Sequence, residues 1–123
     1  MSIDELLDQI HLLPESSKTL FVEHFVEKKV KKGDLILKAE YTEKHIYFIK
    51  KGIVRAYSPM PNQDITFYFG EEGDVIISMN SYVTKNKGYE NIEALENCTL
   101  YELSSDILDQ LYQQDIHIAN WGG

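Results

Sequence analysis

The chain has 123 residues, of which 43% are apolar and 26% charged, a composition typical of a single globular domain with one core. Its 12 Lys and Arg residues face 20 Asp and Glu residues, and the net charge of −8 argues against nucleic-acid binding through the overall field. The apolar runs are far shorter than the ~20 residues of a membrane span, the acidic start lacks the basic region of a signal peptide, and a single cysteine excludes an internal disulfide, so we expect a cytoplasmic protein.

Two short helices are expected in residues 1–25. Ser2 followed by Glu5 is a capping-box pattern, and apolar residues then recur at helical spacing as far as Ile10. Pro14 suits the first turn of a second helix. The apolar stripe of this second helix consists of Leu20, Phe21, His24 and Phe25.

Short strands separated by turn residues are expected in residues 26–103. The candidates are residues 34–38, 45–50, 53–58, 65–69, 75–77, 89–95 and 99–103. Segment 45–50 is predicted to be buried on both faces, and 65–69 to be half-buried, because its apolar and polar residues alternate. Residues 59–64 are predicted to form a loop. No helix is expected between these strands, which indicates an antiparallel sandwich or barrel.

The middle of the chain is basic, with nine Lys and Arg residues against three acids in residues 28–55, a net charge of +6. This segment is either an anion-binding face or the solvated side of a strand and turn, where lysines protect a sheet edge. We favour the second interpretation.

Two helices are expected in residues 104–123. Ser104, Ser105 and Asp106 form a strong helix start. A further helix begins near Asp115 and ends at Gly122 after barely two turns. Its apolar residues need a partner, which is the barrel, a second chain or further chain.

Residues for catalysis or metal binding are sparse. The four histidines, His11, His24, His45 and His117, are all more than ten residues apart, so no metal-binding motif is present. The chain has no nucleophile elbow, Walker loop or dinucleotide fingerprint. Cys98 is interpreted as a small core residue. We therefore expect that the chain is not an enzyme and that it binds no metal and no cofactor. The alternative is a metal-dependent cupin-type enzyme, which the wide spacing of the histidines disfavours.

Three stretches together carry a family resemblance. They are Lys32-Gly33-Asp34-x-Ile36, the segment 46–55 with Gly52, and FGEEGDVI at 69–76, followed by Ile92-Glu93-Ala94-Leu95-Glu96. The chain thereby resembles the cyclic-nucleotide-binding domain of the Crp/Fnr superfamily of transcription regulators. The resemblance implies a mainly β fold, an antiparallel jelly-roll β-barrel (double-stranded β-helix) with flanking N- and C-terminal helices. Residues 1–123 would form one such domain, with helices in 1–25, the barrel in 26–103 and truncated helices in 104–123.

The resemblance also implies a role. Similar proteins bind a small effector inside the barrel, dimerise through a long helix after it, and bind DNA through a helix-turn-helix that is absent here. The chain is therefore interpreted as an effector-sensing domain, either truncated or a fragment. A homodimer is expected for the complete protein and only weak dimerisation for this chain, with DNA bound only through the missing domain. The alternative is a non-sensing jelly-roll scaffold for dimerisation or protein interaction.

The ligand anchors of the family are missing. Its Gly-Glu pair, whose Glu holds the ribose, falls on Ile77 and Ser78, and the Arg that pairs with the cyclic phosphate falls near Gly88. Cyclic AMP is therefore not expected to bind in the usual way, although an unknown small effector remains possible as a partner. The candidate ligand-binding residues are Arg55, Ser78, Asn80, Ser81, Tyr82, Gly88 and Tyr89. The competing interpretation is that Ser78 and Ser81 cap a turn, Tyr82 packs in the core and Arg55 forms a surface ion pair.

Overall fold

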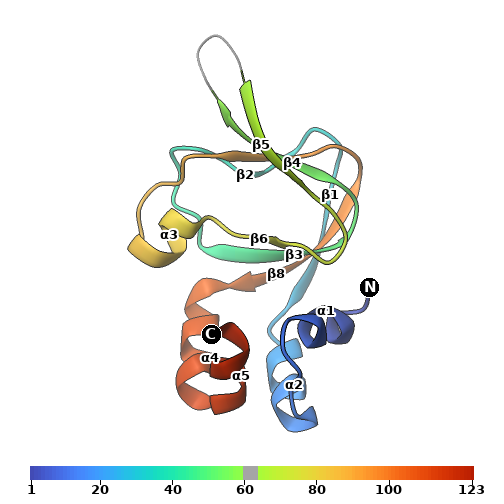
Figure 1. The fold of residues 1–123 in the computed structure, drawn as a ribbon, viewed down its shortest axis with the longest axis vertical. Helices are drawn as coiled ribbons and strands as arrows, with labels where there is room; N and C mark the ends of the chain where they lie inside the picture. Colours follow the sequence, from blue (N-terminus) through green and yellow to red (C-terminus); the bar gives the residue numbers. More distant parts are fainter. Residues whose placement is uncertain (60–63) are drawn as a thin grey trace.

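The computed structural model describes residues 1–59 and 64–123, with only the backbone described at residues 64 and 65. Two four-stranded antiparallel sheets pack face to face (Figure 1). The first has the order β1 (Val26–Val30), β8 (Cys98–Ser104), β3 (His45–Lys51) and β6 (Val75–Ile76). The second has the order β2 (Leu35–Leu37), β7 (Asn91–Ala94), β4 (Val54–Pro59) and β5 (Asp64–Gly70). This confirms the predicted jelly-roll fold with flanking helices.

Strand β3 separates two apolar cores, because it is apolar on both faces as predicted. Ile46 and Phe48 face the helices, whereas Tyr47 and Ile49 belong to the core between the sheets. All four side chains are at most 5% exposed. Side chains alternate along a strand, so one continuous apolar run supplies both cores.

Helices α1 (Ile3–Ile10), α2 (Glu15–Val22), α4 (Ser105–Gln114) and α5 (Ile116–Gly122) gather against the first sheet (Figure 1). The predicted capping box at Ser2 is present. Ser104 caps α4 and Asp115 caps α5. Pro14 lies just before the first turn of α2 rather than inside it. None of the described helices is long and apolar enough to cross a membrane.

The partner that α5 needs is this chain's own core. The Trp121 ring meets Phe21 edge-on at 4.9 Å between centroids, and its Nε1 donates a hydrogen bond of 2.8 Å to the buried carbonyl of Leu7. Ile118 is fully buried. The last helix is therefore tied to α1 and α2 as well as to the sheet.

Strand β1 is an edge strand whose side chains are largely exposed. Lys28 pairs with Glu102 at 3.3 Å, and Lys50 on β3 pairs with Glu27 at 2.8 Å. This arrangement agrees with the lysines acting as the solvated side of a sheet edge.

The prediction for residues 65–69 is only half right. The strand forms, but its side chains at Phe67, Tyr68 and Phe69 are 54%, 43% and 64% exposed. β5 is the other sheet's edge strand, and the hairpin that it forms with β4 extends beyond the sandwich (Figure 1). Alternation distinguishes the two faces of a strand but does not show whether another layer covers either of them. Of the predicted loop, residues 60–63 lie outside the described residues.

Candidate functional site

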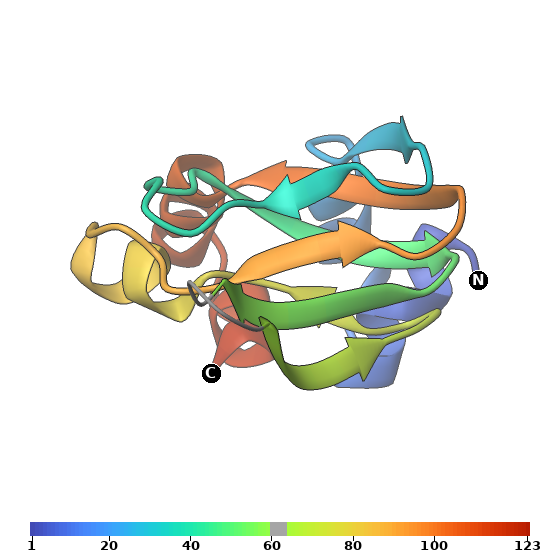
Figure 2. The same cartoon turned by 90° about the horizontal axis from the view of Figure 1, so that it is seen from above.

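A short helix, α3 (Met79–Thr84), stands at one end of the sandwich, between β6 and β7 (Figure 2). The expectation of no helix between the strands is therefore wrong at this point, although α3 does not connect parallel strands. Ser78 caps its N-terminus by accepting a hydrogen bond from the Ser81 amide at 3.4 Å. Lys85 ends it in the left-handed conformation, with φ of 59°. The helix therefore has a defined start and end although it has only six residues.

The hydroxyl and amide groups of α3 are used within the protein. Ser78 Oγ donates to Ser81 Oγ at 3.2 Å, and Ser81 Oγ donates to the carbonyl of Asn86 at 2.8 Å. Ser81 Oγ also accepts from the Glu43 amide at 3.0 Å. Asn80 Nδ2 donates to the Lys87 carbonyl at 2.5 Å. These bonds fix the loop after α3, as the capping interpretation expects.

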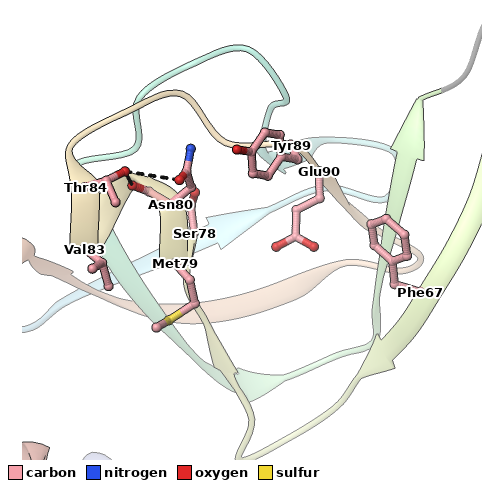
Figure 3. Close-up of a pocket in the computed structure, with 8 residues that line it drawn as sticks. All are labelled: Phe67, Ser78, Met79, Asn80, Val83, Thr84, Tyr89 and Glu90. Atoms are coloured by element: carbon pink, nitrogen blue, oxygen red, sulfur yellow. Dashed lines mark hydrogen bonds between the residues drawn. The ribbon is translucent and has the colours of Figure 1, made fainter.

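A cavity of about 530 Å³ opens between α3, β5 and the segment that leads into β7 (Figure 3). This cavity, the α3 pocket, is walled by one residue of β5, the cap and one face of α3, and two residues before β7. Its lining residues are Phe67, Ser78, Met79, Asn80, Val83, Thr84, Tyr89 and Glu90.

The charge of the α3 pocket is negative. Among the described lining residues there is no Lys, Arg or His, and Glu90 is the charged one. Its carboxylate points into the space between Met79 and Phe67 (Figure 3). Burial raises the pKa of Glu90. It also raises the pKa of the nearby Tyr68 phenol, and the charge of Glu90 adds to that shift.

The α3 pocket brings together three of the predicted ligand-binding residues, Ser78, Asn80 and Tyr89. Ser81, 2% exposed, lies behind the cap and supports it. Gly88 is also buried next to the cap: a Cβ placed on it would lie 2.7 Å from Ser78 Oγ. The site thus has no room for a side chain at residue 88 in this arrangement.

Two predicted residues lie elsewhere. Tyr82 faces the helices, packs against their core and donates a hydrogen bond to Asp109 on α4 at 3.3 Å. Arg55 lies on the outer face of β4, because its neighbours Val54 and Ala56 are fully buried between the sheets.

The Arg55 guanidinium forms the ion pair that the competing interpretation expects. It donates to Glu93 at 3.3 Å and to Thr66 Oγ1 at 3.3 Å. It also lies 4.0 Å from the centroid of the Tyr57 ring. These contacts hold Arg55 away from the α3 pocket, whose described lining does not include it.

The sequence analysis missed Glu90, Phe67 and Met79. The signal for Glu90 was available in the alternation of the segment that leads into β7. Ile92 and Ala94 face the inter-sheet core, and Glu90 has the same parity, so it continues the inward face. Phe67 became a wall residue because the β4–β5 hairpin lies across from α3, which local patterning does not show.

Comparison with known proteins places these features in context. The sequence model of the cyclic nucleotide-binding domain matches residues 27–115. No curated protein sequence matches the chain significantly. The chain also resembles many solved structures. The three described next are 13% to 19% identical to it in sequence, so the resemblance shows the fold alone.

Three of these structures illustrate the range. A cyclic nucleotide-binding domain from Methylobacillus flagellatus has a TM-score of 0.85 and 19% identity, over 97% of this chain and 68% of its own. The sensor domain of the transcriptional regulator DNR from Pseudomonas aeruginosa has a TM-score of 0.77 and 14% identity, over 93% and 75%. The regulatory subunit of a cAMP-independent protein kinase A from Trypanosoma cruzi, bound to guanosine, has a TM-score of 0.76 and 13% identity, over 87% and 39%. In several other neighbours the chain spans 40% to 54% of a longer protein.

Proposed function

The chain belongs to the cyclic nucleotide-binding domain family, and we propose that it is the effector-sensing domain of a Crp/Fnr-type transcription regulator that does not bind cyclic AMP in the usual way. The observation that carries this proposal is the α3 pocket: it is open, and its one charged lining residue in the described part of the chain is an acid. The sensor domain of the regulator DNR has a similar fold, which supports the regulatory context. The role is regulatory rather than catalytic, in the cytoplasm, with dimerisation and DNA binding carried out by other parts of the regulator.

Electrostatics explain why a cyclic phosphate does not suit this pocket. A buried phosphate needs a paired cation, and a bidentate arginine is the strongest such partner. The resemblance places that arginine near Gly88, and Glu90 adds a negative charge to the α3 pocket next to it. Loss of one partner of a buried charge pair costs ~2–5 kcal/mol, and loss of the ribose contact at Ser78 adds ~1–3 kcal/mol.

Calorimetric titration with cyclic AMP and cyclic GMP tests this proposal. Together these losses weaken a micromolar ligand to roughly millimolar affinity or beyond. We expect dissociation constants in that range for both nucleotides. A dissociation constant of about ten micromolar or tighter would refute the residue assignment, because it would require a cation that the described lining of the α3 pocket does not contain.

The second candidate function is a scaffold for protein interaction that senses nothing. The exposed aromatic side chains Phe67, Tyr68 and Phe69 on edge strand β5 favour it. Thermal-shift measurements against an effector panel separate the two functions. A ligand at 100 times its dissociation constant stabilises the fold by ~2.7 kcal/mol, whereas a scaffold shows no shift with any member of the panel.

A further inference from the structure

Glu90 is an unmatched charge at the wall of the α3 pocket. The carboxylate is partly buried, and within the described part of the chain it forms no hydrogen bond and no ion pair. A carboxylate that is withdrawn from water without a partner is costly. Any ligand that closes the pocket over Glu90 therefore has to supply a donor or a positive charge.

The surroundings of Glu90 are apolar and unusually exposed. Met79, Val83 and Tyr89 are 59%, 64% and 73% exposed, and Phe67 across the pocket is 54% exposed. Figure 3 shows the Tyr89 ring above the Glu90 carboxylate and the Phe67 ring to its right. Aromatic rings beside a carboxylate form a suitable environment for an organic cation, whose charge is attracted both to the anion and to the ring faces.

The other polar groups of the pocket have partners already. Ser78 and Asn80 are bonded to Ser81 and to the Lys87 carbonyl, and Thr84 Oγ1 donates to the Asn80 carbonyl at 2.6 Å. This leaves the carboxylate of Glu90 and the hydroxyl of Tyr89 to select a ligand. A carboxylate accepts hydrogen bonds and does not donate them, so it selects N–H donors.

We propose that the α3 pocket binds a small organic cation, an ammonium or amidinium group on a flat apolar body, with its N–H groups on Glu90 and its body between Phe67 and Tyr89. The inference rests on the proposed function, since it names the class of effector for that same pocket. The net charge of −8 also favours the approach of a cation over that of an anion.

Three indole probes of similar size test the inference: tryptamine is a cation, tryptophol is neutral and indole-3-propionate is an anion. Each is titrated into the chain with detection by calorimetry and by backbone amide chemical shifts. We expect tryptamine to bind about tenfold or more tightly than tryptophol, with indole-3-propionate weakest and with shifts centred on α3 and on Tyr89 and Glu90.

The variant Glu90→Gln keeps the shape of the side chain and removes its charge. It should reduce tryptamine affinity to the level of tryptophol and leave tryptophol affinity unchanged. Glu71→Gln is the matched control, because it removes the same charge from an exposed turn residue outside the pocket. It should leave the order of the three probes intact. Tryptophol binding to Glu90→Gln also shows that the variant is folded.

The possible failures are distinguishable. The proposal that Glu90 selects a cation is wrong if the three probes bind with equal affinity, or if the preference for tryptamine persists in Glu90→Gln. In both cases the pocket remains a candidate effector site. Guanosine is the molecule bound to the Trypanosoma neighbour. If it binds the chain more tightly than tryptamine does, the proposal of a cationic ligand is wrong and an uncharged nucleoside is favoured. If none of the three indoles binds in the pocket, the proposal of a cationic ligand is also wrong. The proposed effector-sensing function fails only if guanosine and the wider effector panel do not bind either.

Discussion

The substitution Gly88→Ala probes the packing between residue 88 and Ser78, the residue that caps α3 beside the pocket. Backbone bonds hold the Gly88 segment in place: its amide donates to the Tyr41 carbonyl at 3.1 Å, and its carbonyl accepts from the Glu40 amide at 3.0 Å. An added Cβ would lie 2.7 Å from Ser78 Oγ. Because the backbone at residue 88 is held on both sides, the hydroxyl of Ser78 has to move.

The cost follows from what that hydroxyl does. Ser78 Oγ caps α3 through the Ser81 amide and donates to Ser81 Oγ. Loss of an N-cap costs ~0.5–2 kcal/mol, so we expect Gly88→Ala to destabilise the fold by about 1–2 kcal/mol. Ser78→Ala loses the same cap by itself.

The double variant makes the test specific. With Ser78→Ala in place, the nearest Ser78 atom to the new methyl group is its Cβ, at an ordinary 3.7 Å. Gly88→Ala should then be neutral, or stabilising by ~0.4–1 kcal/mol, because alanine restricts the unfolded chain. The double-mutant cycle should therefore show about 1–2 kcal/mol of coupling in favour of the double variant.

Urea unfolding followed by the fluorescence of Trp121, the single tryptophan of the chain, measures all four proteins. We expect the double variant to be no less stable than either single variant, although independent effects would add. Effects that add to within ~0.3–0.5 kcal/mol would refute the reasoning, because they would show that Ser78 Oγ does not obstruct a side chain at residue 88.

Three further predictions concern the helices. Trp121→Phe removes the side-chain donor to the Leu7 carbonyl, which still accepts from the His11 amide, and should destabilise the fold by ~0.5–1.5 kcal/mol in urea unfolding followed by circular dichroism. Asp115→Ala removes the cap of α5 and should cost about 1 kcal/mol at neutral pH. Although burial opposes ionisation of Asp115, hydrogen bonds from Ser17 and two backbone amides outweigh it and lower its pKa. Its contribution to stability is therefore present above the ordinary aspartate pKa of 3.8 and lost as the pH falls below it, so the Asp115→Ala difference should shrink between pH 5 and 2 in unfolding titrations. Sedimentation at micromolar concentration should show mostly monomer, since α5 has only seven residues and cannot form the several heptads of a coiled coil; a tight dimer would contradict this.

Helix ends and the doubly buried strand could be predicted because their signals are local. Ser2, Ser104 and Asp115 each cap the helix that the sequence assigns to them, since a cap depends on residues within one turn. Segment 45–50 was recognisable because a short run of β-branched and aromatic residues that ends at Lys51-Gly52 is typical of a strand with an apolar layer on each face.

The exposure of β5 and the composition of the α3 pocket were not predictable in the same way. Whether Phe67 is covered depends on which elements pack across the hairpin, and no residue near it in the sequence reports that. Three of the predicted ligand-binding residues, Ser78, Asn80 and Tyr89, do lie together in one pocket, because they are close to the same helix start and strand start. Arg55 was predicted because an anionic ligand needs a cation, whereas the charged residue in the described lining of the pocket is the acid Glu90.

The altered positions of the pocket depend on one another. Ser78 occupies the place that the resemblance gives to the ribose-binding glutamate, and its hydroxyl fills the space that a side chain at Gly88 would need. Glu90 then brings a negative charge to the same wall. An arginine introduced at residue 88 alone would displace the cap of α3, because its Cβ already meets Ser78 Oγ, and the described lining of the pocket beside it carries an acid and no other cation. We therefore expect that a cyclic-phosphate site could be restored only by changing Ser78 and Gly88 together, whereas Glu90→Gln alone should keep the shape of the pocket and change its charge.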